Sequence, residues 1–429
     1  MHELSQMIKD DMKPALGVTE PGAIAFAVAK ARSYTKGEIE RVNVALNSGM
    51  YKNAFTCGIP NSPEVGNVFA AALGAVAGNS DKGLEALADV TEKDNELAKS
   101  FIDEGKIGVT LSGITSRIFI EATVCTKEDK AVVTIRDSHT NITKIVVNDE
   151  TILETEDETK EVKEGAAESH KIHEYTLKEL VDYVNTVEFS EIEFIEEAYR
   201  VNGELFDEGI RNERTTFARQ LLVMNGGQII SKDEQATASL LCNAAIEARV
   251  IGLDKPAMSI TGSGAHGIIA TMPLYAAYKV NGYTKEQLLR ATALSYLVCM
   301  YIKEYSGRLS AFCGCAIAAG TGMACALVWL RGGTVEMMEH TINNMASSIT
   351  GMICDGGNQG CTMKGVAAVD AAYKSVEFAM NGIYIYPVHG INGPTAEETM
   401  RYMGMIASPG MTGTEKTIVE IFENKLKKN

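Results

Sequence analysis

The hydrophobic pattern changes its period part-way along the chain, and this change constrains the fold most. Between residues 38 and 154, apolar and polar residues alternate in short segments, a pattern typical of half-buried β-strands. From about residue 176 to the end, apolar residues recur every three or four positions, which predicts helices. The sequence therefore predicts an α+β protein with a mixed α/β first half and a large all-helical second half.

The same pattern predicts individual elements. Strands are expected at 38–47, 106–111, 117–125, 130–136 and 142–147, with a weaker candidate at 151–154. Helices are expected at 2–12, 19–33 (with Thr19 as N-cap), 64–77, 92–104, 176–186, 190–211, 215–225, 232–251, 266–281, 284–305, 310–331, 334–350, 361–381, 395–407 and 414–427. The acidic segment 149–169 is expected to be a solvated loop or hairpin tip.

A chain of 429 residues is long enough for two or three domains. We expect a helical arm at 1–34 that packs on the helical domain, an α/β domain at 35–190, and an all-helical domain at 191–429.

Charge and cysteine usage restrict the partners. The net charge of -16 argues against nucleic acid or an anionic membrane as the main partner. No apolar run suggests a membrane helix, the polar start suggests no signal peptide, and nine cysteines suggest no disulfide framework. We therefore expect a cytoplasmic protein with a small-molecule substrate. The Ala-, Gly- and Met-rich segments 310–331 and 361–381 are compatible with a homodimer.

Three cysteines near the C-terminus are candidate metal ligands. Cys354 and Cys361 bracket the loop Cys-Asp-Gly-Gly-Asn-Gln-Gly-Cys, and Cys313 lies upstream. Soft thiolates select iron–sulfur clusters, zinc or copper(I), and glycines let the backbone approach an inorganic core. The spacing is not a standard zinc or ferredoxin spacing, so buried structural thiols are the alternative interpretation.

A Gly- and Ser-rich stretch at 261–267 stands where a helix is expected to begin. Free N–H groups at such a helix start can bind a carboxylate, here near Ser263 and Gly264. The stretch lacks the Gly-Lys-Ser/Thr ending of a P-loop, and we expect no strand before it in the Rossmann manner. An inter-helix packing loop is the alternative.

Other polar residues are candidates for proton transfer or substrate contact. His139 can act as a base, donor or anchor, or be satisfied in a turn. Lys52 can hold a carboxylate or take a proton, or be a surface lysine. Arg308 can pair with substrate or orient the cysteine loop, or form a structural ion pair, and His266 is a weaker candidate.

Several segments together resemble the L-cysteine desulfidase family, which is related to the alpha part of iron–sulfur L-serine dehydratases. The resemblance runs in order along nearly the whole chain, and the cysteine segments are its most specific part. It rests on Gly17-x-Thr19-Glu20-Pro21, Lys52-Asn53, His139-Thr140-Asn141, the Gly-Ser-Gly-x-x-Gly segment at 262–267, Arg308-Leu309-Ser310-Ala311-x-Cys313 and Gly351-Met352-Ile353-Cys354-Asp355-Gly356.

The resemblance implies a [4Fe-4S] cluster on Cys313, Cys354 and Cys361, with Cys315 as a near neighbour. It implies β-elimination without pyridoxal phosphate: cysteine gives sulfide, pyruvate and ammonia, and water leaves from serine. The residues expected to hold the amino acid are Glu20, Asn53, Thr140, Asn141, Ser263, Gly264 and Arg308.

One position departs from the family pattern. The motif is Gly-Cys-Thr-Glu-Pro with its cysteine as the proposed base, and this chain has Val18 there. Valine cannot accept a proton, so the expected bases are Cys57, Lys52 or His139, with a buried structural role as the alternative for Cys57. Other hypotheses are a different acid as substrate, a non-catalytic cluster- or ligand-binding protein, and a zinc enzyme on the same thiolates.

Overall fold

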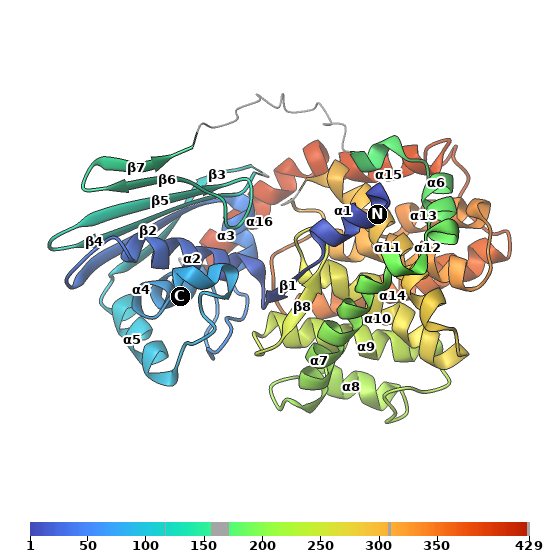
Figure 1. The fold of residues 1–429 in the computed structure, drawn as a ribbon, viewed down its shortest axis with the longest axis horizontal. Coiled ribbons are helices and arrows are strands. Elements are labelled where there is room, and N and C mark those ends of the chain that lie inside the picture. Colours follow the sequence, from blue (N-terminus) through green and yellow to red (C-terminus); the bar gives the residue numbers. More distant parts are fainter. Residues whose placement is uncertain (116, 156–170, 308–309, 427–429) are drawn as a thin grey trace.

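The computed structural model describes residues 1–115, 117–155, 171–307 and 310–426. Arg308 and most of the acidic segment lie outside these ranges. Figure 1 shows two lobes, one built on a β-sheet and one of packed helices. The predicted α+β class is confirmed.

The larger sheet has the strand order β3-β2-β4-β5-β6-β7. β2 and β3 are parallel, and all other neighbours are antiparallel. The predicted strands are confirmed to within a few residues. Their bounds are Ile39–Asn47 (β2), Ile107–Gly113 (β3), Phe119–Thr126 (β4), Lys130–Arg136 (β5), Ile142–Val147 (β6) and Glu150–Glu154 (β7).

Alternating residues place one face of this sheet in the core. In β4, Ile120, Ala122 and Val124 are buried, whereas the intervening Glu121 and Thr123 are half-buried. Helix α2 (Thr19–Arg32) packs on β4 and β5, and α4 (Asn67–Val76) packs on α2, β2 and β3. Helix α5 (Glu92–Asp103) packs outside α4.

The helical lobe contains elements from α6 to α15. Several of its helices are buried on all sides, as expected for the interior of a large helical domain. Their bounds are Leu177–Thr186 (α6), Glu196–Arg211 (α7), Phe217–Met224 (α8), Glu234–Val250 (α9), Gly264–Asn281 (α10), Lys285–Ser306 (α11), Gly320–Leu330 (α12), Val335–Ile349 (α13), Gly360–Met380 (α14) and Ala396–Met405 (α15). Helix α12 is already buried within the chain, so the homodimer stays a prediction.

The second half is not entirely helical. Strand β8 (Pro256–Ser259) pairs antiparallel with β1 (Lys13–Leu16) and directly precedes α10. We expected neither strand. Four residues are too few to show a period, and the pairing joins segments that are far apart in the sequence. The two strands form an antiparallel pair, so α10 still does not follow a parallel strand of the Rossmann kind.

The segments at both ends of the chain cross from one lobe to the other (Figure 1). Helix α1 (Glu3–Asp11) and β1 pack on the helical lobe, whereas α2 packs on the sheet. Helix α16 (Thr412–Leu426) returns to the sheet lobe and packs on α3 (Ser48–Ala54), where the rings of Phe55 and Phe422 stack with centroids 4.5 Å apart. The domain boundaries at 34 and 190 remain predictions.

Two helix starts differ from expectation. Helix α2 begins at Thr19, and Val18 is its N-cap without a side-chain cap bond, so the predicted Thr19 cap is wrong. The helix expected from residue 310 begins later, with a π-type turn at Cys315–Ala319, because Phe312 pairs in an extended conformation with Ile353. No helix among the described residues is long and apolar enough to cross a membrane.

Candidate functional site

Two cysteine segments are joined by backbone hydrogen bonds. The N–H of Cys313 donates to the Met352 carbonyl at 3.0 Å, and the N–H of Cys354 donates to the Ala311 carbonyl at 2.6 Å. These bonds flank the isolated bridge between Phe312 and Ile353. The extended pairing therefore brings Cys313 and Cys354 side by side, although they are distant in sequence.

The glycine-rich loop after Cys354 lies against the sheet lobe. Gly356 has φ +99°, and a Cβ there would lie 2.4 Å from the Lys52 carbonyl oxygen, so only glycine permits this approach. The N–H of Gly357 donates to the Asn53 carbonyl at 3.1 Å. The loop ends at Cys361 in the first turn of α14, with the Cys361 thiol 3.5 Å from the Gly356 carbonyl oxygen.

Four thiols of this region influence one another. The pKa of Cys313 is raised well above its ordinary value by its hydrogen bond with Cys315 and by burial. The same hydrogen bond holds the pKa of Cys315 well below its ordinary value, helped by His266 and Arg249. Burial raises the pKa of Cys361 to about 12, with further contributions from Cys315 and Cys354. The three predicted ligands and Cys315 therefore occupy one neighbourhood.

The donor set is of the kind that iron–sulfur clusters use, because soft thiolates are their ligands. In the part of the chain that the structure describes, no three His, Cys, Asp or Glu side chains form a group that could hold one metal ion. Cys313, Cys354 and Cys361 would be the residues that hold a cluster, each through a different iron.

Two residues of the sheet lobe meet the cysteine loop. Asn53 Nδ2 donates to Glu20 Oε1 at 2.8 Å, and Asn53 Oδ1 lies 4.0 Å from Cys354 Sγ. Val18 is buried, and a Cβ on Gly357 would lie 2.9 Å from its Cγ1. The position at which the family motif has cysteine therefore adjoins the loop, as does the predicted pair Glu20 and Asn53.

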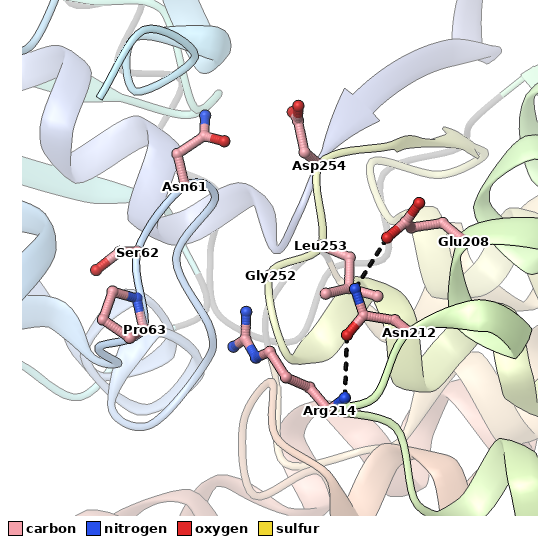
Figure 2. Close-up of a pocket in the computed structure, with 9 residues that line it drawn as sticks. All are labelled: Asn61, Ser62, Pro63, Glu208, Asn212, Arg214, Gly252, Leu253 and Asp254. Atoms are coloured by element: carbon pink, nitrogen blue, oxygen red, sulfur yellow. Dashed lines mark hydrogen bonds between the residues drawn. The ribbon is translucent and has the colours of Figure 1, made fainter. Parts of the chain in front are cut away.

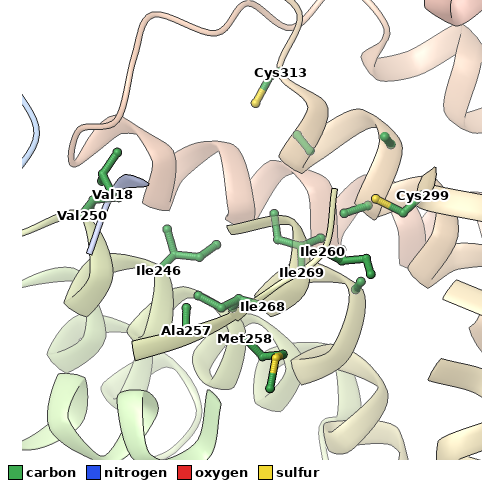
Figure 3. Packing of buried hydrophobic residues seen from close by; sticks show 14 of the residues in the cluster. Val18, Ile246, Val250, Ala257, Met258, Ile260, Ile268, Ile269, Cys299 and Cys313 are labelled. Atoms are coloured by element: carbon green, nitrogen blue, oxygen red, sulfur yellow. The ribbon is translucent and has the colours of Figure 1, made fainter. Parts of the chain in front are cut away.

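The start of α10 lies on the other side of the thiols. Ser263 Oγ lies 4.0 Å from Cys315 Sγ. His266 is 4% exposed, hydrogen-bonds Thr261 through Nδ1, and also hydrogen-bonds Cys315. Figure 3 shows Cys313 and Val18 at the margin of the apolar cluster that includes Ile246 and Ile268.

Comparison with known protein families shows to which family the chain belongs. Residues 81–420 match the family described as serine dehydratase alpha chain. The chain belongs to this family. The serine dehydratase alpha chain family is associated with iron–sulfur chemistry, which agrees with the thiol-rich site.

Several proteins are similar to this member of the serine dehydratase alpha chain family over almost its whole length. A protein of Clostridium botulinum (strain Okra / Type B1) is 40% identical over 418 residues, covering 97% of each chain. One from Caldanaerobacter subterraneus subsp. tengcongensis is 37% identical over 422 residues, covering 98% of each. One from Clostridioides difficile (strain 630) is 33% identical over 423 residues, covering 98% of this chain and 99% of the relative. All three carry the name "UPF0597 protein", which states no activity.

Two of the predicted bases, Cys57 and Lys52, are buried. Burial raises the pKa of Cys57 well above its ordinary value, and the nearby Glu20 carboxylate adds to the effect. Lys52 is 1% exposed and donates to the Ser310 carbonyl at 2.9 Å and to Glu415 Oε2 at 2.7 Å. Lys52 is thus a buried, ion-paired residue that links the site to α16.

The segment His139-Thr140-Asn141 forms the turn between β5 and β6. Thr140 and Asn141 are exposed, and Asn141 Nδ2 donates to the Arg136 carbonyl at 3.1 Å, within the turn. His139 is half-buried in the same turn. The contacts of Asn141 support a turn-closing role for it.

Two functional candidates have no sequence motif that would reveal them. Arg249 is the penultimate residue of α9, and it acts electrostatically on Cys57 and Cys315. Lys303 lies in α11, is 6% exposed, and has its pKa lowered by burial while the charges of Cys315 and Cys354 oppose that shift. Only the packing of α9, α10 and α11 around the thiols brings these cations to the site.

The open hollows of the surface lie elsewhere. Figure 2 shows a cleft of about 380 Å³ between the lobes, whose polar lining includes Asn212 hydrogen-bonded to Glu208 and to the Arg214 N–H. A second hollow of about 480 Å³ is lined by residues of α13 and the segment 385–391. Neither of these two hollows is lined by a cysteine, and Cys315, Cys354 and Cys361 are each partly exposed.

Proposed function

We propose that this protein is an iron–sulfur lyase that removes sulfide from L-cysteine or water from L-serine. The observation that supports the proposal is that the segments of Cys313 and Cys354 pair through backbone hydrogen bonds, and that Cys354 lies 4.0 Å from Asn53, which hydrogen-bonds Glu20 in the other lobe. A cluster on these three thiolates, when bound, supplies a Lewis-acidic iron that stabilises the charge developing on the leaving sulfur or oxygen.

The groups around the thiols suit a small amino acid. Ser263 and the first turn of α10 offer hydrogen-bond donors to a carboxylate. Glu20, which accepts from Asn53, offers a carboxylate to an ammonium group. Holding both ends of the amino acid orients its Cα–H and Cβ–S bonds before proton transfer begins.

We favour Lys303 as the proton acceptor, because its side chain lies against Gly314, between Cys313 and Cys315, with Lys303 Cδ 3.3 Å from the place a Cβ would take. The pKa of Lys303 is lowered by burial, which favours the neutral amine that can take the α-proton. Lys52 is instead engaged in its ion pair with Glu415, and burial raises the pKa of Cys57, which disfavours its thiolate. Proton loss from Cα and departure of hydrosulfide from Cβ leave aminoacrylate, which gives pyruvate and ammonia with water.

The test uses protein reconstituted with iron and sulfide without oxygen. We expect pyruvate and sulfide from L-cysteine, or pyruvate from L-serine. Cys354→Ser should lose bound iron and cluster absorbance together with activity. Cys125→Ser, in β4 of the sheet, is the matched control and should keep all three. Retained iron and full turnover in Cys354→Ser would exclude Cys354 as a ligand.

The presence of Val18 favours a second candidate function, in which the protein binds a cluster and an amino acid without turnover. Val18 lies against Gly357, at the position of the family's proposed base, and has no proton-accepting atom. Iron-loaded protein that binds L-cysteine but releases neither sulfide nor pyruvate would support this second candidate.

A further inference from the structure

Arg249 is a buried cation that no carboxylate pairs with in the part of the chain that the structure describes. It is 5% exposed, and its Nε is buried without a hydrogen-bond partner. No ion pair joins its guanidinium to another residue in the ranges that the structure describes. Arginine is almost never buried unless it is paired, because removing its charge from water is costly. An anion from outside the chain is therefore expected beside it.

The start of α10 lies directly against this guanidinium. A Cβ on Gly264 would lie 2.7 Å from Arg249 Nε and 2.8 Å from the Ala257 Cβ, so glycine is what leaves room for the side chain. Gly264 opens an 18-residue helix whose N-cap, Ser263, makes no side-chain cap bond. The first N–H groups of a helix have no intrahelical partner and carry partial positive charge.

These two features converge beside the thiols. Ser263 Oγ is 4.0 Å from Cys315 Sγ, and Arg249 lies within electrostatic range of Cys57 and Cys315. Glu20, whose carboxylate helps to raise the pKa of Cys57, accepts a hydrogen bond from Asn53. A small anion placed between Arg249 and the helix start would thus adjoin the reacting groups.

We propose that Arg249, together with the N-terminus of α10, binds the carboxylate of the substrate and selects α-amino acids over the corresponding amines. This inference rests on the proposed function for the identity of the substrate. Arginine suits the role because its planar fork binds both carboxylate oxygens at once. Arg249 is then a binding residue for the group that elimination leaves untouched.

The test compares two probes that cannot eliminate. L-alanine keeps the carboxylate and has no leaving group, and ethylamine is the same molecule without the carboxylate. Calorimetry on the iron-loaded protein should show that Arg249→Gln weakens L-alanine binding on the order of 10- to 100-fold, as expected for a lost charged hydrogen bond. Ethylamine binding should not change. Arg200→Gln, an exposed arginine paired with Glu197 and Glu204, is the control and should bind as wild type.

A second variant guards against a folding defect. Gly264→Ala keeps Arg249 but places a methyl group against it, and it should weaken L-alanine binding in the same selective way. Thermal unfolding of both variants shows whether they fold. Unchanged L-alanine binding in both variants, equal loss of both probes in Arg249→Gln, or a wild type that does not bind L-alanine would each overturn the inference. Equal loss would instead make Arg249 a counter-ion of the thiols.

The two proposals fail separately. If the wild-type protein binds L-alanine through Arg249 but forms no pyruvate from L-serine or L-cysteine, the carboxylate site stands and the proposed elimination reaction is wrong. If pyruvate forms with a KM that does not depend on Arg249, the elimination reaction stands and the carboxylate site is wrong.

Discussion

Lys52 and Glu415 form a buried ion pair, with 2.7 Å between Nζ and Oε2, that joins α3 of the sheet lobe to the last helix of the chain. Lys52 also donates to the Ser310 carbonyl, at the start of the segment that leads to Cys313. The pair therefore connects three distant parts of the sequence at one edge of the thiol site.

Removing one partner of this pair should be strongly destabilising. Glu415→Leu leaves the Lys52 charge buried without compensation, at a cost of about 3–5 kcal/mol in the free energy of unfolding. Urea denaturation measures it. Glu420→Gln, at an exposed position of α16, should change little. The double variant Lys52→Met/Glu415→Leu should recover most of the loss, and a double variant as unstable as the single one would contradict the ion-pair account.

Gly357 and Val18 should show strong coupling. Gly357→Ala places a methyl group 2.9 Å from Val18 Cγ1, an overpacking expected to cost about 1–3 kcal/mol. Val18→Ala removes the opposing methyl groups and should cost about 1.5 kcal/mol alone. The double variant should lose less free energy of unfolding than the sum of the two single losses, and a double-mutant cycle of urea denaturation measures this difference. Strict additivity would mean that the loop does not pack on Val18.

Restoring the family cysteine tests whether a base is missing. Val18→Cys places a thiol beside the cysteine loop, and a group that takes the α-proton contributes on the order of 10²-fold or more to turnover. Because we propose Lys303 as the proton acceptor, we expect kcat for L-cysteine to stay near the wild-type value, with Val18→Ala as the control for lost packing. A rise of this size would show that the wild type lacks an effective base and would contradict the role of Lys303.

A buried thiol should make the protein less stable in alkali. Burial raises the pKa of Cys325 from 9.0 to about 12. Above pH 9 the unfolded chain loses this proton and the folded chain keeps it, so stability falls as pH rises. The contribution of one such thiol is about 1.4 kcal/mol per pH unit. The free energy of unfolding of Cys325→Ala should decline less steeply between pH 9 and 11 than that of the wild type. The difference in free energy of unfolding between the two at pH 7 measures the lost packing. Equal declines in both proteins would contradict the raised pKa of Cys325.

Local patterns were sufficient for most elements because helices and strands repeat over a few residues. The strands β5 and β6 have the bounds that alternation predicts, and α10 begins at the glycine-rich segment. Elements without a visible period were missed: β1 and β8 have four residues each, and α3 has seven. The extended segment before Cys315 was also missed, because its partner is Ile353 and not a neighbour in sequence.

The sequence by itself determined the α+β class, the three cysteines in their glycine-rich setting, and the loss of the motif cysteine at Val18. Only the tertiary structure decided that Asn53 and Val18 meet the cysteine loop, that Glu415 pairs with Lys52, and that the Nε of Arg249 is buried at the start of α10 without a hydrogen-bond partner. The physical reason is that burial and charge pairing depend on long-range packing between lobes, which short-range periodicity does not encode.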